Sequence, residues 1–475
     1  MRHEDLFTPL LPSDDLPFAF DLPLAVDHAA PGQPADAGSA GRAAAIGLQR
    51  PVADASPDGI PAPVAGTEDP TVDSLPRSEP PPADPAEGGW ISAFIPAIAE
   101  APAPSAVSPT GWSVTSAVAN SGTTSIDALN SGVKWGAGGA GTAVTVSYSF
   151  PAGGAVWGVN YGSGEPVFGY APLTAEQQNA ARIALQRWDE VAAITFVEVP
   201  DTARNVGDIR FANSGVPFTA WAYYPGPFAE AGDVWFGPNF DYGSARPGTY
   251  SLLTFIHEIG HAIGLKHPHE SGGSAVALST AVDYLGHTVM SYRSYVGQDV
   301  SAGYSNSFYP TTPGIFDIAA LQYLYGTDTT TRAGDTVYRW TPGAQLFETI
   351  WDAGGIDTID WSNQTSPAVI NLTSGVWSRL GPAYSTAAGA DDRTLKIAFG
   401  AIIENAVGGA GNDRISSGPD DDTVAGGDGN DKVNLGPGVD TVDGGEGRDF
   451  LQGLDGADVI HGGPGDDRGP EPADP

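Results

Sequence analysis

The chain has 475 residues, of which 57 are acidic and 21 basic, and its formal net charge of −36 argues against nucleic acid or anionic lipid as a partner. It contains no cysteine, which excludes disulfide bonds and thiolate zinc ligands, and it has no run of 18 apolar residues that could span a membrane. Because aspartate is abundant among many glycines, we expect the chain to attract cations, and calcium above all.

The first zone, residues 1–112, is dominated by Ala, Pro, Asp and Ser, with stretches such as PPPADPAEGG. Prolines at this density remove backbone donors and disfavour both helices and central strands. Two interpretations stay open: a disordered tail, and a pro-segment that is removed or displaced on maturation. The extreme N-terminus has acids and prolines where a secretory signal needs an apolar stretch, so we expect no cleaved N-terminal signal peptide.

The second zone, residues 113–325, mixes helix and strand patterns and is predicted to be a globular α+β domain. Apolar and polar residues alternate from Val144 to Phe150, which predicts a half-buried strand. A helix is predicted from Thr174 to about Ala193, because Thr174 and Gln177 match a capping box and apolar residues then recur at helical spacing. The other predicted elements are strands at 194–199, 208–212, 218–223 and 233–236 and helices at 252–263 and 315–325.

His257, Glu258 and His261 form the pattern HExxH within the second of these helices. A spacing of four residues puts both imidazoles on one helix face, one turn apart, where they can bind one metal ion. Gly264 lets the helix end and the chain turn, so that His267 can reach the same ion. Three neutral imidazoles and a water make an open tetrahedral site, which is typical of catalytic zinc.

Glu258 cannot reach the metal as its flanking histidines do, and we expect it to lie beside the metal-bound water. The metal lowers the pKa of that water, and the carboxylate can take its proton during attack on a carbonyl and then pass it to the leaving amine. His269 and His287 are near the motif in sequence. We expect both to be surface or supporting residues that bind no metal.

The segment around Met290 completes a resemblance to a known family. Met290 is the only methionine after the initiator, about two dozen residues past the third histidine, and Ser291 and Tyr292 follow it. HExxHxxGxxH with a downstream methionine resembles the metzincin metallopeptidases. Pro268, directly after the third histidine, and the sequence MSY are similar to the serralysin family within them. The resemblance covers about residues 111–407 and extends into the repeats that follow.

The resemblance implies a metzincin zinc-peptidase fold and roles for several further residues. Gly264, Pro268 and Met290 would be structural residues near the zinc, with Met290 in the turn beneath it. Tyr292 would be a fifth zinc ligand that swings aside and helps to stabilise the transition state, and a buried structural tyrosine is the alternative. Metzincins bind an extended peptide along an edge strand, which here would be the strand at 218–223; an ordinary core strand is the alternative.

From Gly408 onward the chain repeats every nine residues in the pattern GGxGxDxUx, where U is apolar. The pattern predicts calcium between successive turns and short strands, with the apolar residue pointing inward, that stack into a parallel β-roll over residues 408–470. An isolated further calcium loop is predicted around Asp352 and Asp357. The predicted calcium-binding residues of the repeats are Asp413, Asp422, Asp431, Asp440, Asp449 and Asp458 with Gly409, Gly411, Gly427, Gly429, Gly445 and Gly447.

The repeats also allow predictions about folding and export. Without calcium the aspartates repel one another and the small apolar core cannot offset the chain entropy, so we expect this part to be unfolded. In the family such repeats accompany one-step secretion from Gram-negative bacteria, which implies a secretion apparatus as a partner. Relatives usually continue into strands with an apolar secretion signal, whereas here RGPEPADP follows the repeats. A different signal, a shortened chain and another export route all stay open.

These features predict an α+β metzincin catalytic domain at 113–325, followed at 326–475 by a β-rich part that contains the β-roll. We expect a secreted, extracellular and monomeric endopeptidase that hydrolyses internal peptide bonds of proteins, with one catalytic Zn²⁺ and several structural Ca²⁺. One alternative is a non-catalytic calcium-binding adhesin or scaffold that retains a peptidase-like domain. Another is a peptidase held latent by residues 1–112, without a thiolate on the zinc because no cysteine is present.

Overall fold

The computed structural model describes residues 114–158, 161–271 and 276–469. The predicted tail or pro-segment at 1–112 lies outside the described residues, and so does the last residue of the predicted repeat region. The described residues fall within one compact unit. None of the helices among them combines the length and the apolar character that crossing a bilayer requires.

The sheet of the N-terminal half confirms the predicted strands. Its strands are ordered β5-β3-β6-β8-β7, and β4 (Ala171–Pro172) pairs with β6 outside this order. The edge strand β7 (Ala220–Ala222) is antiparallel to its neighbour β8, so the segment predicted to be an edge strand does lie at an edge. The other four strands run parallel: β3 (Val144–Ser149), β5 (Ile194–Glu198), β6 (Ile209–Asn213) and β8 (Val234–Phe236).

The helix α2 (Ala175–Asp189) starts with the predicted capping box, in which Gln177 N–H donates to Thr174 Oγ1 and Thr174 N–H donates to Gln177 Oε1. It ends earlier than predicted because the residues after it pair with the chain beyond the last helix. Ala193 N–H donates to Gly326 O at 2.9 Å. The last helix, α4 (Ile315–Tyr325), has the predicted bounds.

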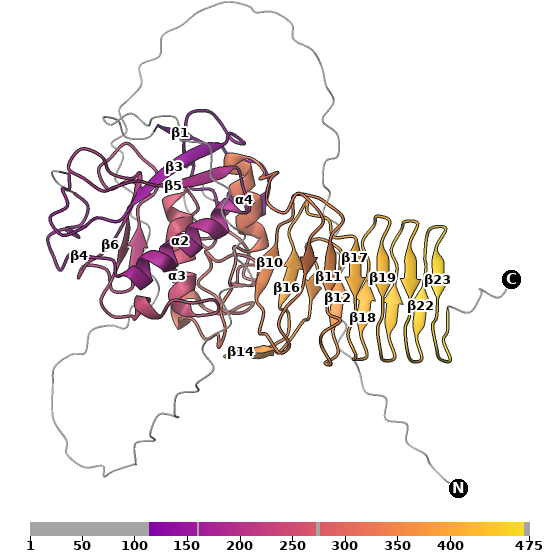
Figure 1. Ribbon diagram of the computed structural model, residues 1–475. Helices are drawn as coiled ribbons and strands as arrows, with labels where there is room; N and C mark the ends of the chain where they lie inside the picture. The colour runs from indigo at the N-terminus through magenta and orange to yellow at the C-terminus, as the bar shows by residue number, and fades with distance from the viewer. Residues whose placement is uncertain (1–113, 159–160, 272–275, 470–475) are drawn as a thin grey trace, which may run out of the picture. The chain divides into compact units, whose positions relative to one another are not determined.

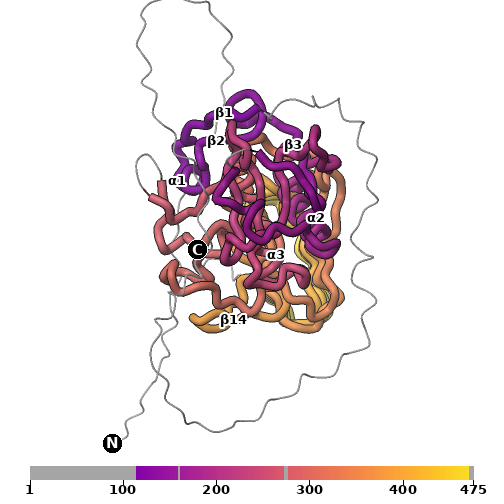
Figure 2. Tube along the Cα trace, turned by 90° about the vertical axis from the view of Figure 1, so that its left-hand side faces the viewer, coloured from indigo at the N-terminus to yellow at the C-terminus, as the bar shows by residue number. Residues whose placement is uncertain are grey.

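The helix α3 (Tyr250–Ala262) carries the HExxH motif and is buried on every side from Leu252 to Ala262. Leucine, isoleucine and phenylalanine surround the motif, and a helix that is apolar all round lies inside a protein. It packs between α2 and the strands β7 and β8, and α2 and α3 lie side by side in both views (Figure 1, Figure 2). This position places the motif residues beside the edge strand.

Shorter elements complete the N-terminal half. A two-stranded ribbon of β1 and β2 precedes the main sheet, and α1 lies between its strands and contacts α4. Two 3-10 turns flank α3 in the sequence. These elements are β1 (Thr115–Ala117), α1 (Thr124–Asp127), β2 (Val133–Trp135), η1 (Tyr242–Ser244) and η2 (Val300–Ala302).

Beyond Tyr325 the described residues contain strands and no helix, as predicted. Two parallel sheets, ordered β23-β21-β19-β17-β11-β9 and β12-β18-β20-β22, form the β-roll, whose strands follow one another in Figure 1. Its strands are β9 (Val337–Tyr338), β11 (Thr358–Asp360), β12 (Val369–Asn371), β17 (Asn405–Val407), β18 (Arg414–Ser416), β19 (Thr423–Ala425), β20 (Lys432–Asn434), β21 (Thr441–Asp443), β22 (Phe450–Gln452) and β23 (Val459–His461).

A smaller sheet and a hairpin precede the repeats. The sheet is ordered β10-β16-β13, and β14 pairs only with β15 to form the antiparallel hairpin. The bounds of these strands are β10 (Glu348–Ile350), β13 (Trp377–Ser378), β14 (Tyr384–Thr386), β15 (Gly389–Asp391) and β16 (Leu395–Ile397).

Successive nine-residue units alternate between the two sheets of the roll, so each strand pairs with the strand 18 residues away. Ile415 pairs with Val433, for example, and Val424 with Val442. The apolar eighth residue is at most 2% exposed in the first five units, which confirms that it points inward. The sixth unit contradicts the prediction, because Ile460 is 46% exposed. No later strand among the described residues covers it, since the next unit has Gly469 in the apolar position.

The loop around Asp352 and Asp357 was predicted to be isolated, and this is wrong. The strand β11 follows it and pairs in parallel with β17 on one side and with β9 on the other. The loop is therefore the beginning of the same stacked architecture. Its sequence diverges from the nine-residue pattern, so the pattern did not predict that the strand after this loop belongs to the same sheet.

Candidate metal centre

Three imidazoles converge in the N-terminal half, as the motif predicts. The Nε2 atom of His267 lies 3.1 Å from that of His257 and 2.9 Å from that of His261. All three residues are buried, and their ligand atoms lie within 4.8 Å of one another. A tetrahedral zinc site with bonds of about 2.0–2.1 Å to nitrogen separates its ligand atoms by about 3.3 Å. The spacing of the three nitrogens therefore fits one such ion.

The other ring nitrogens fix which atoms face the common point. His257 Nδ1 lies 2.8 Å from Val289 O, and His261 Nδ1 lies 2.8 Å from Leu265 O. A carbonyl oxygen only accepts, so each Nδ1 carries the proton and each Nε2 keeps its lone pair. His267 is held in the same way by the Glu270 carboxylate, with Nδ1 to Oε1 at 2.7 Å. Three lone pairs that meet in a buried site fit a bound cation.

Burial keeps these rings neutral. It lowers the pKa of His257 to about 4 and moves the pKa values of His261 and His267 well below the ordinary value, with the neighbouring histidines adding to the effect. A neutral imidazole is the form that binds a metal. The set is therefore in its metal-binding protonation state over the whole neutral range.

Glu258 lies in the same buried region. It is 2% exposed, and burial raises the pKa of its carboxyl well above the ordinary value. Its Oε2 is buried and makes no hydrogen bond to any of the described residues. A buried carboxylate oxygen without a partner costs folding free energy, so its retention indicates a functional residue.

Tyr292 lies against the histidines, as the resemblance implies. Its ring is stacked on that of His257, with centroids 5.8 Å apart at 19°, and it lies 4.4 Å from the ring of His267. It is 5% exposed. His269 stacks on His267 at 5.3 Å and also touches Tyr292 at 5.0 Å. His287 packs on Phe316 instead and lies outside the three-histidine group.

The predicted structural residues surround the metal centre. Gly264 has φ +105°, and a Cβ there would lie 2.4 Å from Val133 O, so only glycine fits where the chain turns after α3. Pro268 is buried, and its carbonyl accepts from Leu278 N–H. Met290 is fully buried, and a Cβ added at Gly260 would lie 2.5 Å from its sulfur. The sequence motif did not indicate this constraint on Gly260.

Asp317, at the start of α4, is a further residue that sequence analysis missed. Its carboxylate accepts from Thr288 Oγ1 at 2.5 Å and from the backbone N–H groups of Val289 and Gly314, each at 2.7 Å. It thus ties the turn that carries Met290 to α4. An acidic residue three positions into a helix is a local capping signal, but no local pattern could have indicated its contact with this turn.

Two more residues that were missed hold the loop of the third histidine. Glu270 orients His267, as described above. The ammonium group of Lys266 donates to four carbonyl oxygens, those of Ala128 at 2.6 Å, Val276 at 2.9 Å and His267 and Glu270 at 3.4 Å each. A buried lysine that binds only carbonyls joins the loop on both sides of the metal ligand to α1's C-terminal end.

A small hollow adjoins Glu258. It has a volume of about 10 Å³ and is lined by Tyr250, Leu253, Thr254, His257, Glu258 and Tyr304. That volume holds about one water molecule. The edge strand β7 packs on α3 as well, so an edge strand of the sheet and a hollow both lie against the helix that carries the motif.

The repeat aspartates form a second group of candidate metal-binding residues. Asp413, Asp422, Asp431, Asp440 and Asp449 are each at most 2% exposed. Burial raises the pKa values of all five, to about 6 for Asp422 and about 7 for Asp431. Asp458, next to the last described turn, is only half-buried.

Within the part of the chain that the structure describes, four of these five aspartates have a hydrogen-bond partner on only one carboxylate oxygen. The backbone N–H of Asp413 donates to Asp431 Oδ1 at 2.8 Å, and the same bond recurs from Asp431 to Asp449. In Asp422, Asp431, Asp440 and Asp449 one carboxylate oxygen is buried without a hydrogen-bond partner among the described residues. Aspartate oxygens left open in stacked Gly-rich turns fit calcium, which prefers such ligands. In Asp413 both oxygens accept backbone N–H groups.

The repeat glycines are required by the stacking. A Cβ at Gly427 would lie 2.2 Å from Gly409 O, and one at Gly447 would lie 1.5 Å from Gly429 O. A Cβ at Gly429 would likewise clash with Gly411 O, and one at Gly445 would clash with Gly427 O. The carbonyls of Gly409 and Gly427 accept N–H groups of the next turn. These glycines are therefore packed between turns, and their predicted role as calcium ligands stays a prediction.

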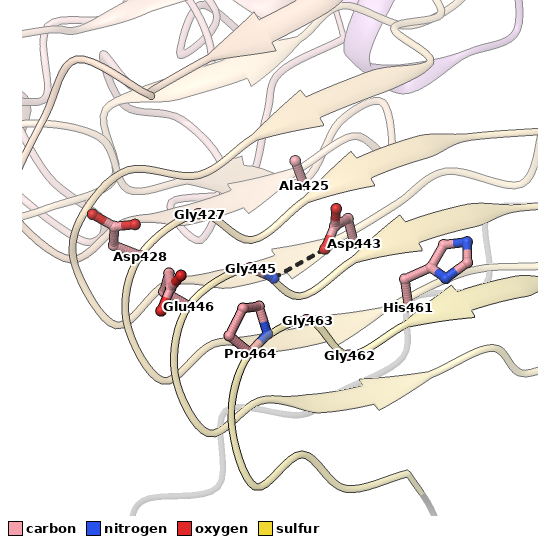
Figure 3. Close-up of a pocket in the computed structure, with 10 residues that line it drawn as sticks. All are labelled: Ala425, Gly427, Asp428, Asp443, Gly445, Glu446, His461, Gly462, Gly463 and Pro464. Carbon is pink, nitrogen blue, oxygen red and sulfur yellow. Dashed lines mark hydrogen bonds between the residues drawn. The ribbon is translucent and has the colours of Figure 1, made fainter.

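A larger hollow lies on the surface of the roll, away from the histidines. It is an open trough of about 680 Å³ across successive turns, drawn in Figure 3. Residues 18 apart repeat along it because they lie on neighbouring turns of one sheet. They include Ala425, Asp443 and His461 in one row and Asp428, Glu446 and Pro464 in another. The trough follows from the repeat geometry and small side chains, so we assign it no ligand.

The fold and the three-histidine centre resemble those of zinc peptidases, and comparisons with known families agree. Residues 168–278 match the family described as Matrixin, and residues 322–461 match Peptidase M10 serralysin C terminal. The matched parts of this chain are thus similar to serralysin-type metzincins. The fold predicted from the sequence is confirmed.

Individual relatives support the same assignment. Serralysin C of Dickeya chrysanthemi is 38% identical over 268 residues, 52% of this chain and 54% of that protein. Metalloprotease AprA of Pseudomonas entomophila (strain L48) is 36% identical over 263 residues, 50% of this chain and 52% of that protein. Serralysin of Proteus mirabilis is 34% identical over 283 residues, which are 52% of this chain and 55% of that protein. The chain spans about half the length of the curated relatives it matches.

Proposed function

We propose that this protein is a zinc-dependent endopeptidase that hydrolyses internal peptide bonds of proteins. The observation that carries the proposal is the convergence of three Nε2 lone pairs beside the buried, incompletely bonded carboxylate of Glu258. His257, His261 and His267 would hold the zinc ion. When bound, zinc supplies Lewis acidity and lowers the pKa of a water molecule.

Glu258 acts as the general base in this proposal. Its free Oε2 accepts the proton of the attacking water, and the same carboxyl group then donates that proton to the leaving amine. The apolar surroundings of α3 exclude bulk water and keep the carboxylate basic. His257 and His261 stay in one tautomer throughout because backbone carbonyls hold their Nδ1 protons.

Tyr292 acts as a polar group beside the reacting carbonyl and, as the family resemblance implies, as a further ligand of the zinc. Its position over His257 and His267 supports this role. A phenol hydroxyl can donate to the oxygen on which negative charge develops during the reaction. Its contribution is separable from that of Glu258 because Tyr292→Phe keeps the ring stacking and removes the hydroxyl.

The substrate would bind as an extended chain along β7. This strand is paired only with β8 in its sheet, and α3 packs against it. An added strand would bond through main-chain groups, which fits an enzyme that accepts many protein sequences. The substrate class is therefore unfolded or flexible segments of proteins.

The β-roll would be stabilised by several calcium ions bound through the open aspartate oxygens. Extracellular calcium is high enough to fill weak sites of this kind, so the roll suits a secreted, extracellular and monomeric enzyme. Export through a one-step secretion apparatus fits repeats that fold only after calcium binds. The relatives named serralysin support this part of the proposal.

Hydrolysis of casein by the full chain, with zinc and millimolar calcium, tests the function. We expect Glu258→Ala to lower the rate by at least about 10³-fold while zinc stays bound. Glu176→Ala, at an exposed position of α2, is the matched control and is expected to keep full activity. Equal hydrolysis by wild type and Glu258→Ala would refute the assigned base. No hydrolysis by zinc-loaded wild type would favour the non-catalytic calcium-binding scaffold instead.

A further inference from the structure

The hollow beside Glu258 has one wall that does not come from the motif helix. Tyr250, Leu253, Thr254, His257 and Glu258 all belong to α3, whereas Tyr304 comes from a segment 46 residues after Glu258. The rings of Tyr304 and Tyr250 lie 5.8 Å apart, and the Tyr304 hydroxyl donates to Ser291 O at 2.8 Å. The position of Tyr304 therefore decides how large the hollow is.

The segment that carries Tyr304 is hydrogen-bonded to the β14–β15 hairpin of the C-terminal half. Ser307 N–H donates to Ser385 O at 2.8 Å, and Ser385 N–H donates to Ser307 Oγ at 2.8 Å. Ala387 N–H donates to Ser305 Oγ at 3.0 Å. Three hydrogen bonds thus connect Ser305 and Ser307, just after Tyr304, to a hairpin about 80 residues away in the sequence.

The hairpin itself is firmly anchored. Tyr384, at its start, is 1% exposed and stacks on Phe347 with ring centroids 4.5 Å apart at 13°. The next residues of the Tyr304 segment are held by the same region, since Thr311 N–H donates to Phe347 O and Thr349 N–H donates to Thr312 Oγ1. Because the anchored hairpin bonds to the residues just after Tyr304, it can act as a positioning element for this wall of the hollow.

The hollow lies where one particular substrate side chain would be. Glu258 donates its proton to the leaving amine in the proposed reaction, so the residue that contributes this amine lies beside Glu258. A hollow of about 10 Å³ accommodates about a methyl group and rejects larger side chains unless Tyr304 moves. Thr254 Oγ1 already donates to Tyr250 O, so its hydroxyl can only accept a hydrogen bond from a substrate side chain.

We infer that the β14–β15 hairpin, through Ser305 and Ser307, holds Tyr304 as the wall of this hollow and so restricts the residue that contributes the amine to a small side chain. This inference rests on the proposed endopeptidase function. Ser305 and Ser307 are positioning residues, because they act through Tyr304 and touch no reacting atom. The C-terminal half then contributes to substrate selection as well as to stability.

The test uses peptides that differ only in the residue contributing the amine, Ala or Phe, and measures kcat and KM separately. Wild type is expected to prefer Ala by at least about 10-fold. The double variant Ser305→Ala, Ser307→Ala loses hydrogen bonds to the hairpin, and we expect its preference to fall by roughly 2- to 10-fold, through a lower KM for the Phe peptide. Ser305→Thr with Ser307→Thr keeps the hydroxyls and should restore the preference.

Ser301→Ala is the matched control, because Ser301 lies in the same stretch but its hydroxyl bonds only to Asp299. Ser307 is exposed, so Ser307→Ala alone supplies the measurement if the double variant does not fold. Wild type that cleaves the peptides with no preference, or variants that change both peptides equally, would overturn the inference and leave the endopeptidase proposal intact. Failure of wild type to cleave either peptide or casein would instead refute both.

Discussion

The histidine centre and the β-roll differ in how many of their buried polar groups have a hydrogen-bond partner within the protein. Around the histidines, carbonyls and Glu270 fix all three rings, and Asp317 holds the turn beneath them. In the roll, four buried aspartates each keep an oxygen without a partner among the described residues. A centre of the first kind is preorganised for its metal, whereas we expect a stack of the second kind to need its cations in order to fold.

The largest expected effect separates these two regions directly. We expect removal of calcium, with zinc resupplied, to abolish hydrogen-exchange protection in residues 408–469 because the buried aspartates then repel one another. The helix α3 should stay protected. Segment-resolved hydrogen exchange with and without millimolar calcium measures both. If the repeats keep their hydrogen-exchange protection without calcium, the proposed difference between the two regions is wrong.

The next effect distinguishes the interior of the roll from its last turn. Ile415 is 1% exposed, whereas Ile460, in the same position of the repeat, is 46% exposed. In saturating calcium we expect Ile415→Ala to lower the free energy of unfolding by about 2–5 kcal/mol. Ile460→Ala should lower it by about 1 kcal/mol or less. Chemical denaturation of both variants gives the comparison, and equal losses would show that the last turn is covered in solution.

A smaller effect probes how tightly the region beneath the zinc centre is packed. A Cβ at Gly260 would lie 2.5 Å from the sulfur of Met290, so Gly260→Ala is expected to cost about 1–3 kcal/mol. Met290→Ala removes the clashing atom, and the double variant should therefore lose less than the sum of the two single losses. Thermal unfolding of the four proteins tests this coupling. Strict additivity would mean that the helix shifts and that the contact carries no energy.

The smallest effect, counted per pH unit, is a pH dependence in the N-terminal half. Burial, with Lys396 nearby, lowers the pKa of His287 from 6.5 to about 3. Between these values the unfolded chain binds a proton that the folded chain does not, so stability falls as the pH falls. The slope from this group is up to about 1.4 kcal/mol per pH unit. His287→Gln should reduce the slope between pH 6.5 and 4 in denaturation experiments, and an unchanged slope would exclude His287 as its source.

Local patterns predicted much of this molecule because they encode short-range geometry. The capping box of Thr174 and Gln177 fixed the start of α2, and the spacing of His257, His261 and His267 placed three nitrogens at one point. The nine-residue period gave the parallel stacking of the roll. In each case the interacting groups are a few residues apart or repeat at a constant interval.

Contacts across long sequence separations could not be predicted in the same way. Asp317 bonds to Val289 and Thr288, nearly 30 residues earlier, and Ser305 bonds to Ala387. Nothing in the sequence near either partner indicates the other. The exposure of Ile460 was missed for a related reason, since its burial depends on a following strand and not on its own unit.

The alternation of successive units between two sheets has a consequence for how such a chain can change in length. Every unit has the same pattern, so insertion or deletion of nine residues leaves each remaining aspartate above an equivalent neighbour. It moves every later strand to the opposite sheet, however, and whatever follows the last strand then leaves from the other face. A change of 18 residues keeps the exit where it was. An odd or even number of units therefore decides which way the polypeptide points when it leaves the stack.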